Sequence, residues 1–469
     1  MRVFVILFGV VFATAAWRSS SAAVIHLKNG DSIEADEVEE GDSTVQYQIG
    51  DNSFTIPKSK VLDIESGPPQ GRAPAMILAP PVTTLEPKAE SDRELLEQVL
   101  QNGGVDRSVV ASIEARQHPD STAIAYYIAG KSEYESGKFA QARRDFEAAL
   151  RFQPENPAIL AYYAALLVRT GDGIEAVSYA ERAARIAPGS ADAMSVLGYA
   201  QFAAGRNRDA IQSWKKSLAL RPDPTIERML LKAERETSAE SDYSERETSH
   251  FVLRFEGSQS SAGFREQLLS TLESHYQDLA HIFGTEPSSS VQVVLYTSQA
   301  FFDVTRAPSW IGALNDGKLR IPLHGVDSVT PELSRIVRHE LIHTFINQLS
   351  AGRCPAWLNE GIAQMLEPRT LGARIARLGE VFKAEREIPL NMLERSFGSF
   401  TAEEAVLAYD ESLLAASYLT AHYGMGDLIS VLRRIGQGDS TESALRSILH
   451  SSYGRLEEDI RAELVRASP

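Results

Sequence analysis

His339-Glu340-Leu341-Ile342-His343 is the stretch of this 469-residue sequence from which the fold and the chemistry are best argued. Residues four apart lie one above the other on the same face of an α-helix. Two imidazoles at this spacing can bind one metal ion, and the glutamate after the first histidine can then act as a general base at the open side of the metal. The five residues therefore predict a helix that carries a metal site.

The residues around this motif predict a buried helix. Thr330 suits the N-cap, Pro331 suits the first helical position and Gly352 suits the end. Apolar residues wrap most of the circumference between them, which is typical of a helix inside a protein. The alternative is a pair of buried histidines satisfied by ordinary hydrogen bonds, but this would leave Glu340 without a role.

Glu360 is the predicted third ligand, because a catalytic zinc usually has three protein ligands and one open position. It lies 17 residues after His343 (360 − 343), which leaves room for a short turn and a second, antiparallel helix. Small residues at Gly361 and Ala363 would let the two helices approach closely. The alternative is an ordinary exposed glutamate on a helix.

The two segments together resemble a known family. His339-Glu340-x-x-His343 followed by Trp357-Leu-Asn-Glu360-Gly-x-Ala363 is similar to the gluzincins, the thermolysin-like zinc metallopeptidases. The resemblance covers the chain from about Thr248 to the C-terminus. It implies that His339, His343 and Glu360 bind one catalytic zinc ion and that Glu340 activates water. Several gluzincins carry a carboxylate four residues after the glutamate ligand, where this sequence has Gln364.

The resemblance also implies a donor to the developing oxyanion. The segment Ala408-Tyr409-Asp-Glu-Ser412 resembles the helix on which aminopeptidase-like gluzincins carry a tyrosine, which makes Tyr409 the candidate. The alternative is a packing or surface tyrosine. Weaker candidates for the same role follow in the sequence: Tyr418, His422 and Tyr423.

A hairpin is expected over Trp310–Pro322, because Asn315-Asp316-Gly317 is a strong turn signal between two apolar runs. Gluzincins present an edge strand above the metal, to which a peptide substrate adds as a further strand. Pro322 suits an edge strand better than a central one. A plain hairpin without this role is the alternative.

The N-terminus predicts export. Met1–Ala23 has the short basic start, the apolar run and the small residues of a secretory signal peptide, so a periplasmic or secreted protein is expected. An uncleaved anchor is the alternative. No later stretch is apolar enough to span a membrane, and a net charge of −16 argues against nucleic acid as a main partner. Cys354 is the single cysteine; a buried apolar role is expected for it rather than a fourth metal ligand.

Two segments precede the repeats. Residues 24–66 alternate in short strands with turn residues between them, which predicts a small SH3- or Sm-like β module. Residues 67–90 are rich in proline and predict a semi-rigid linker.

A 34-residue repeat occupies the middle of the chain. Gly137, Gly171 and Gly205 are spaced by 34, and so are three alanines and three prolines. This is the tetratricopeptide pattern of stacked helix pairs, so residues 91–236 are predicted to form a solenoid that binds a protein partner. A purely structural arm is the alternative. The predicted repeats are 123–156, 157–190 and 191–224, with capping helices at 91–117 and 224–236.

The resulting prediction is a multidomain, mainly α protein. Residues 237–247 are expected to be a flexible charged linker, followed by an α+β gluzincin-like domain over 248–469 with a helical C-terminal lobe. The predicted function is an exported zinc metallopeptidase whose repeats recruit a peptide or protein substrate or partner. An exported adaptor with a weakly active or inactive peptidase-like domain is the alternative.

Overall fold

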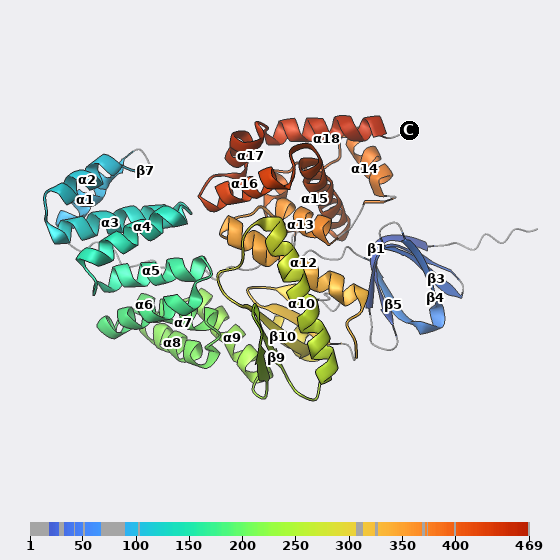
Figure 1. The fold of residues 1–469 in the computed structure, drawn as a ribbon, viewed down its shortest axis with the longest axis horizontal. Coiled ribbons are helices and arrows are strands. Elements are labelled where there is room, and N and C mark those ends of the chain that lie inside the picture. The colour runs from blue at the N-terminus through green and yellow to red at the C-terminus, as the bar shows by residue number, and fades with distance from the viewer. Residues whose placement is uncertain are drawn as a thin grey trace, which may run out of the picture.

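A computed structural model describes residues 18–27, 32–41, 43–49, 52–66, 90–101, 104–305, 313–323, 327–367, 371–372, 374–397 and 400–467. Figure 1 shows a helical solenoid on one side of a mixed α/β body and a small β-sheet on the other. The fold is mainly helical, as predicted. Within the described ranges, no helix combines the length and apolar character needed to cross a membrane.

The N-terminal sheet contains five antiparallel strands in the order β4-β3-β2-β1-β5. Their bounds are β1 Arg18–Leu27, β2 Ser32–Glu40, β3 Thr44–Ile49, β4 Asn52–Pro57 and β5 Val61–Ser66, with the short helix η1 at Lys58–Lys60. The strands start six residues earlier than the predicted module, inside the predicted signal peptide, whose first 17 residues lie outside the described ranges. The predicted linker 67–90 also lies outside them, except for Glu90.

Nine helices form or cap the solenoid among the described residues. They are α1 Glu90–Val99, α2 Arg107–Ala115, α3 Pro119–Glu135, α4 Phe139–Phe152, α5 Pro157–Arg169, α6 Gly173–Ile186, α7 Ala191–Ala203, α8 Asn207–Leu220 and α9 Pro224–Ala239. A short ribbon of β6 (Leu100–Gln101) and β7 (Gly104–Val105) separates α1 from α2. The first repeat helix begins at Pro119, four residues before the predicted repeat start.

The repeated glycines are explained by the backbone and by packing. Gly137, Gly171 and Gly205 have φ values of +72°, +91° and +75°, a left-handed conformation that only glycine adopts without strain. Gly198 has a different reason, because a Cβ atom there would lie 2.4 Å from the indole nitrogen of Trp214. The small and large residues of the repeat pattern are therefore direct packing partners.

The predicted charged linker is not a linker in the structure, so this prediction is wrong. Helix α9 runs to Ala239, and β8 (Ser244–Glu247) then joins the sheet of the C-terminal domain as its edge strand. Glu236 and Glu240 are 0% and 4% exposed, because cations of the C-terminal domain surround them. The last solenoid helix is therefore packed against the C-terminal domain, and the chain enters that domain directly through β8.

The C-terminal domain begins with a sheet in the order β11-β12-β10-β9-β8. Its strands are β9 Phe251–Phe255, β10 Val291–Thr297, β11 Leu314–Asn315 and β12 Leu319–Leu323, together with β8. Helix α10 (Ala262–Phe283) connects β9 to β10, so these two strands are parallel, and α11 (Ser298–Thr305) follows β10. The predicted hairpin is present from residue 313 on, and its residues 310–312 lie outside the described ranges. Pro322 lies in β12, the second strand from the edge. Proline is tolerated there because β11 pairs only with Leu319 and Arg320.

The rest of the domain is helical. Its helices are α12 Pro331–Ser350, α13 Ala356–Leu366, α14 Arg374–Lys383, η2 Met392–Glu394, α15 Ala402–Tyr423, α16 Met425–Gly436, α17 Thr441–Leu449 and α18 Tyr453–Ala467. One apolar core joins the sheet to all these helices. Gly361 permits a close approach as predicted, but to α15 rather than α12, since a Cβ there would lie 2.2 Å from the Ser412 carbonyl oxygen.

Candidate metal centre

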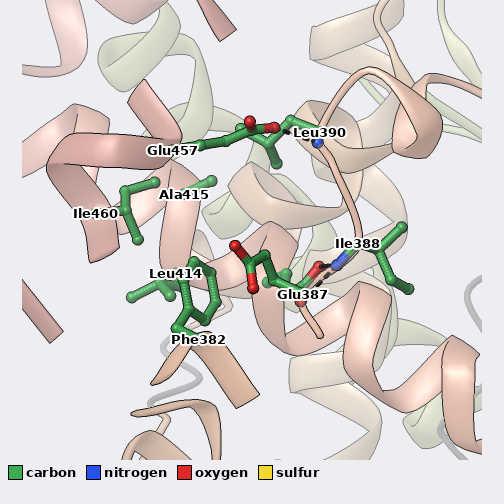
Figure 2. Close-up of a pocket in the computed structure, with 9 residues that line it drawn as sticks. Phe382, Glu387, Ile388, Leu390, Leu414, Ala415, Glu457 and Ile460 are labelled. Carbon is green, nitrogen blue, oxygen red and sulfur yellow. Dashed lines mark hydrogen bonds between the residues drawn. The ribbon is translucent and has the colours of Figure 1, made fainter. Parts of the chain in front are cut away.

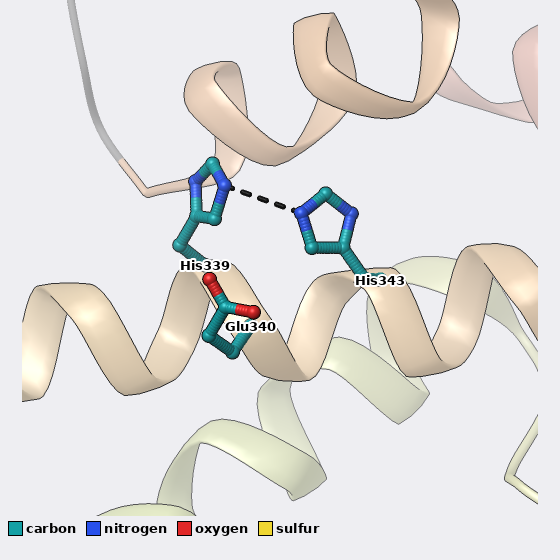
Figure 3. A group of neighbouring side chains, drawn as sticks. All are labelled: His339, Glu340 and His343. Carbon is teal, nitrogen blue, oxygen red and sulfur yellow. Dashed lines mark hydrogen bonds between the residues drawn. The ribbon is translucent and has the colours of Figure 1, made fainter. Parts of the chain in front are cut away.

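Helix α12 presents His339, Glu340 and His343 inside the protein. The Thr330 hydroxyl caps the helix by accepting a hydrogen bond from the Leu333 amide at 3.1 Å, and the helix ends at a left-handed residue, Ala351. Glu340 is fully buried and His343 is 4% exposed. Their ligand atoms and those of His339 all lie within 4.8 Å of one another (Figure 3).

The two imidazoles face each other through their Nε2 atoms, which are 3.2 Å apart (Figure 3). On His339, Nδ1 lies 3.1 Å from a carboxylate oxygen of Glu367. On His343, Nδ1 lies 3.0 Å from the side-chain oxygen of Asn359. Carboxylate and amide oxygens only accept, so both Nδ1 atoms carry the proton and both Nε2 atoms present lone pairs. A metal ion between the two Nε2 atoms, or a proton shared by them, removes the repulsion of these lone pairs.

Helix α13 brings Glu360 to the same place. Its carboxylate oxygens lie 3.6 Å from Nε2 of His339 and 3.8 Å from Nε2 of His343, and the residue is 3% exposed. The turn between α12 and α13 reverses the chain, which places the N-terminal half of α13 beside the histidines. The predicted ligands His339, His343 and Glu360 are therefore together in space, with Glu340 beside them.

The partner of His339 is Glu367 and not Gln364. The Gln364 side chain instead donates to the backbone oxygens of Glu360 and Tyr409, at 3.4 and 3.1 Å. Glu367 comes directly after the last residue of α13 and also accepts a hydrogen bond from Arg335 at 2.9 Å. The carboxylate that the family resemblance places at position 364 is thus supplied three residues later.

The electric field at the site favours positive charge. Burial opposes the charged form of His339, but the Glu367 and Glu360 carboxylates outweigh this effect and raise the pKa of the imidazole. Cys354 lies in the turn before α13, where burial and the nearby Glu360 raise the pKa of its thiol well above the usual value. The thiol therefore stays protonated, and a protonated thiol is a poor metal ligand. Cys354 is partly rather than fully buried.

Tyr409 lies on α15 and is 6% exposed. Its ring packs edge-on against Phe397 at 5.1 Å, and its backbone oxygen accepts the hydrogen bond from Gln364. Tyr418 stacks on His422 at 4.0 Å, and His422 pairs with Glu463 of α18. The structure thus connects Tyr409 to the ligand helix α13, whereas the Tyr418–His422 pair is engaged with α18.

The β11–β12 hairpin is attached directly to α12, which we call the metal helix because it carries the candidate ligands His339 and His343. The side-chain amide of Asn315 donates to the backbone oxygen of Glu340 and to the Thr344 hydroxyl, both at 2.8 Å. Its side-chain oxygen accepts from the Gly317 amide at 3.2 Å, which shapes the turn. The edge strand of the sheet is therefore fixed beside the general-base candidate.

Residues 273–466 match the family model of the Peptidase MA superfamily. This range contains α12 and α13 and hence all the residues of the candidate metal centre. A biofilm formation methyltransferase of Pseudomonas putida, described as probable and named WspC, is 31% identical over 155 residues. That match covers 31% of this chain and 36% of the methyltransferase, so the chain spans about a third of this relative.

Several solved structures are similar to a part of this chain, with TM-scores well below 0.5. They include the first TPR domain of human RPAP3 (21% identity, TM-score 0.25, covering 26% of this chain and 95% of that one). MamA from Desulfovibrio magneticus RS-1 is 18% identical, with a TM-score of 0.27 and coverage of 33% and 88%. The N-terminal domain of stress-induced protein-1 from C. elegans is 24% identical, with a TM-score of 0.22 and coverage of 25% and 97%.

Two residues of the site were not expected from the sequence. Asn359 directly precedes Glu360, so its position beside the predicted ligand was the available signal. Glu367 lies seven residues after Glu360, a spacing of two helical turns that returns to the same face. A search for acidic residues at i+7 as well as i+4 would have found it.

Proposed function

We propose that the chain is a zinc-dependent metallopeptidase of the gluzincin type. The observation that carries this proposal is the convergence of two Nε2 lone pairs, 3.2 Å apart, with the Glu360 carboxylate at 3.6 and 3.8 Å. The match of residues 273–466 to the Peptidase MA superfamily supports it.

The residues fit zinc in kind and in spacing. Two imidazoles and one carboxylate are a common ligand set of catalytic zinc. Ligand atoms about 2.1 Å from a tetrahedral ion lie about 3.4 Å from one another. The separations of 3.2, 3.6 and 3.8 Å are close to this value. Three protein ligands also leave a fourth position for water or substrate.

The mechanism assigns a separate task to each residue. A zinc ion bound here would supply a Lewis acid for the scissile carbonyl group and for water. Glu340, held in a fully buried position, would take the proton of the attacking water and pass it to the leaving amine. Glu367 and Asn359 hold the imidazole rings in one orientation, so the ligands are arranged before the ion binds. Tyr409 would donate a hydrogen bond to the oxyanion.

The remaining parts of the chain are assigned from the sequence. The edge strand β11 would pair with an extended peptide substrate. The apolar start of Met1–Ala23 supports export to the periplasm or the outside of the cell, and the repeats would bind a protein partner or substrate. The N-terminal sheet would serve as an SH3- or Sm-like module.

The decisive experiment compares Glu340→Gln with the wild-type chain. We expect the variant to keep one zinc per chain by metal analysis but to lose hydrolysis of a peptide library by at least about 100-fold, because the general base is removed. His339→Ala should lose the metal as well, and Glu403→Gln, an exposed glutamate on α15, is the matched control.

Full hydrolysis by Glu340→Gln would contradict the mechanism. A wild-type chain that binds zinc and hydrolyses no peptide would instead favour the adaptor function with an inactive peptidase-like domain.

A further inference from the structure

A buried cluster of charges joins the solenoid to the C-terminal domain. Glu236, on the last solenoid helix α9, accepts from Lys318 at 2.8 Å and from Arg320 at 2.7 Å. Glu236 is 0% and Arg320 is 1% exposed. Both cations belong to the β11–β12 hairpin, which lies more than eighty residues further along the chain.

Further contacts of the same kind hold the hairpin from the solenoid side. Lys232 of α9 pairs with Asp316 at the hairpin turn, at 2.7 Å. Asp316 in turn accepts from Arg320 at 2.8 Å. The ammonium group of Lys318 lies 4.8 Å from the ring centre of Phe202 on α7. The turn of the hairpin is therefore bound by side chains of two solenoid helices.

The hairpin, which the solenoid holds in place, is itself bonded to the metal helix. Asn315, next to Asp316 in the turn, holds the Glu340 backbone oxygen and the Thr344 hydroxyl, both at 2.8 Å. A series of contacts thus leads from Glu236 to Arg320 and from Arg320 to Asp316, and Asn315, the residue before Asp316, contacts Glu340 beside the candidate ligands.

The solenoid also touches the other end of α12. Arg353, in the turn that leads to the ligand helix α13, donates to the backbone oxygen of Ser136 at 3.2 Å. Ser136 ends α3, and Ala351 at the end of α12 packs against the solenoid core. The metal helix is therefore braced by the solenoid at its middle, through the hairpin, and at its C-terminal end.

We infer that Glu236 is a positioning residue for the metal centre, and that the solenoid is part of the framework that holds the ligands in place. This inference rests on the proposed function, because it concerns the same metal site. The reason is electrostatic: with Glu236 neutral, two buried cations lose their shared counter-ion and the hairpin can no longer keep its place.

The test uses the full-length chain and two measurements, of which one needs no metal. The first is amide hydrogen exchange of the metal-free protein at residues 314–323 and 340–344. The second is zinc affinity, measured by competition with a chelator. We expect Glu236→Gln to speed exchange in both segments and to weaken zinc binding about tenfold, as changes around metal ligands do.

Two further variants separate positioning from general damage to the solenoid. Asp192→Asn removes another buried carboxylate, which pairs with Arg221 inside the solenoid, and should change neither measurement beyond about twofold. Glu236→Asp keeps the charge and should restore most of the zinc affinity. If Glu236→Gln does not fold, Lys232→Met should show the same two effects, because it removes the ion pair with Asp316 and the contact of the ammonium group with the Phe202 ring.

Equal loss of zinc affinity in Glu236→Gln and Asp192→Asn, or unchanged exchange in the hairpin, would overturn the inference. A wild-type chain that binds zinc but does not hydrolyse peptides would refute the proposed catalysis. Amide hydrogen exchange and zinc affinity would still decide the role of Glu236 in that case. A wild-type chain that binds no zinc would overturn both.

Discussion

Each histidine of the candidate metal centre is held by the ring nitrogen that faces away from the ligand position. Glu367 holds His339 at 3.1 Å, and Asn359 holds His343 at 3.0 Å. A carboxylate does more than orient the ring, because its negative charge raises the basicity of the opposite nitrogen. The two histidines are therefore unequal, and His339 has the stronger electrostatic support.

We expect Glu367→Gln to weaken zinc binding about tenfold, because the amide can still accept the hydrogen bond but carries no charge. Arg335 also loses an ionic partner in this variant. Zinc affinity measured by chelator competition tests the expectation. Glu380→Gln, on the exposed face of α14, is the control and should bind zinc like the wild type. Unchanged affinity in Glu367→Gln would show that the carboxylate only fills space.

The motif residues could be predicted because their arrangement depends on helix geometry alone. His339, Glu340 and His343 share one helix, and the spacing decides their relative positions. The i+7 spacing from Glu360 makes Glu367 a candidate, but only the packing of α13 against α12 brings it to Nδ1 of His339. The family resemblance pointed to position 364, whose side chain is used to join α13 to α15 instead.

At the scale of the elements, the solenoid depends on pairs of small and large residues on adjacent helices. Gly198 on α7 faces Trp214 on α8, which is fully buried and donates from its indole nitrogen to the Ser195 oxygen at 3.2 Å. In the first repeat, Gly130 faces Phe146 in the same way. The helices can approach closely only because one partner of each pair has no side chain.

Gly198→Ala should destabilise the chain by about 2 kcal/mol, because its Cβ atom would lie 2.4 Å from a ring that has no room to move. Higher intrinsic helix propensity of alanine offsets part of this cost. Urea unfolding followed by circular dichroism measures the change. Gly189→Ala is the matched control, since nothing lies within 4 Å of its added Cβ atom. Equal stability of the two variants would contradict the packing argument.

The repeat helices and their order followed from the 34-residue period, whereas the role of the charged stretch after them did not. Charged residues in sequence usually indicate a solvated segment. Glu236 and Glu240 are buried because Lys318, Arg320 and Arg254 neutralise them, and these partners come from distant strands. Contacts between distant segments of this kind leave no local pattern in the sequence.

At the scale of the whole molecule, the C-terminal helices enclose a further buried acidic group that is not part of the candidate metal centre. Glu411 on α15 is 3% exposed and accepts from the Ile388 amide at 3.1 and 3.2 Å. It lines a small, mainly apolar pocket together with Glu387 and Glu457. Figure 2 shows these two glutamates in the pocket. Burial outweighs the hydrogen bond from Ile388 and raises the pKa of Glu411 from 4.5 to about 8.

This group makes the stability of the chain depend on pH. The folded state keeps a proton on Glu411 that the unfolded state releases above pH 4.5, so the stabilising effect is complete below that pH. It is lost as the pH rises through about 8, because the folded state must then carry a buried charge. We expect the free energy of unfolding to fall by about 5 kcal/mol between these limits from Glu411 alone, since one pKa unit corresponds to about 1.4 kcal/mol.

Glu411→Gln should remove this dependence, because an amide does not ionise and can still accept from Ile388. Urea unfolding at pH 5 should give nearly equal stability for the variant and the wild type, whereas at pH 9 the variant should be the more stable. Glu403→Gln, exposed on the same helix, should follow the wild type at both values. Parallel pH profiles for Glu411→Gln and the wild type would mean that this carboxyl group titrates normally, and that burial in the pocket does not suppress its charge.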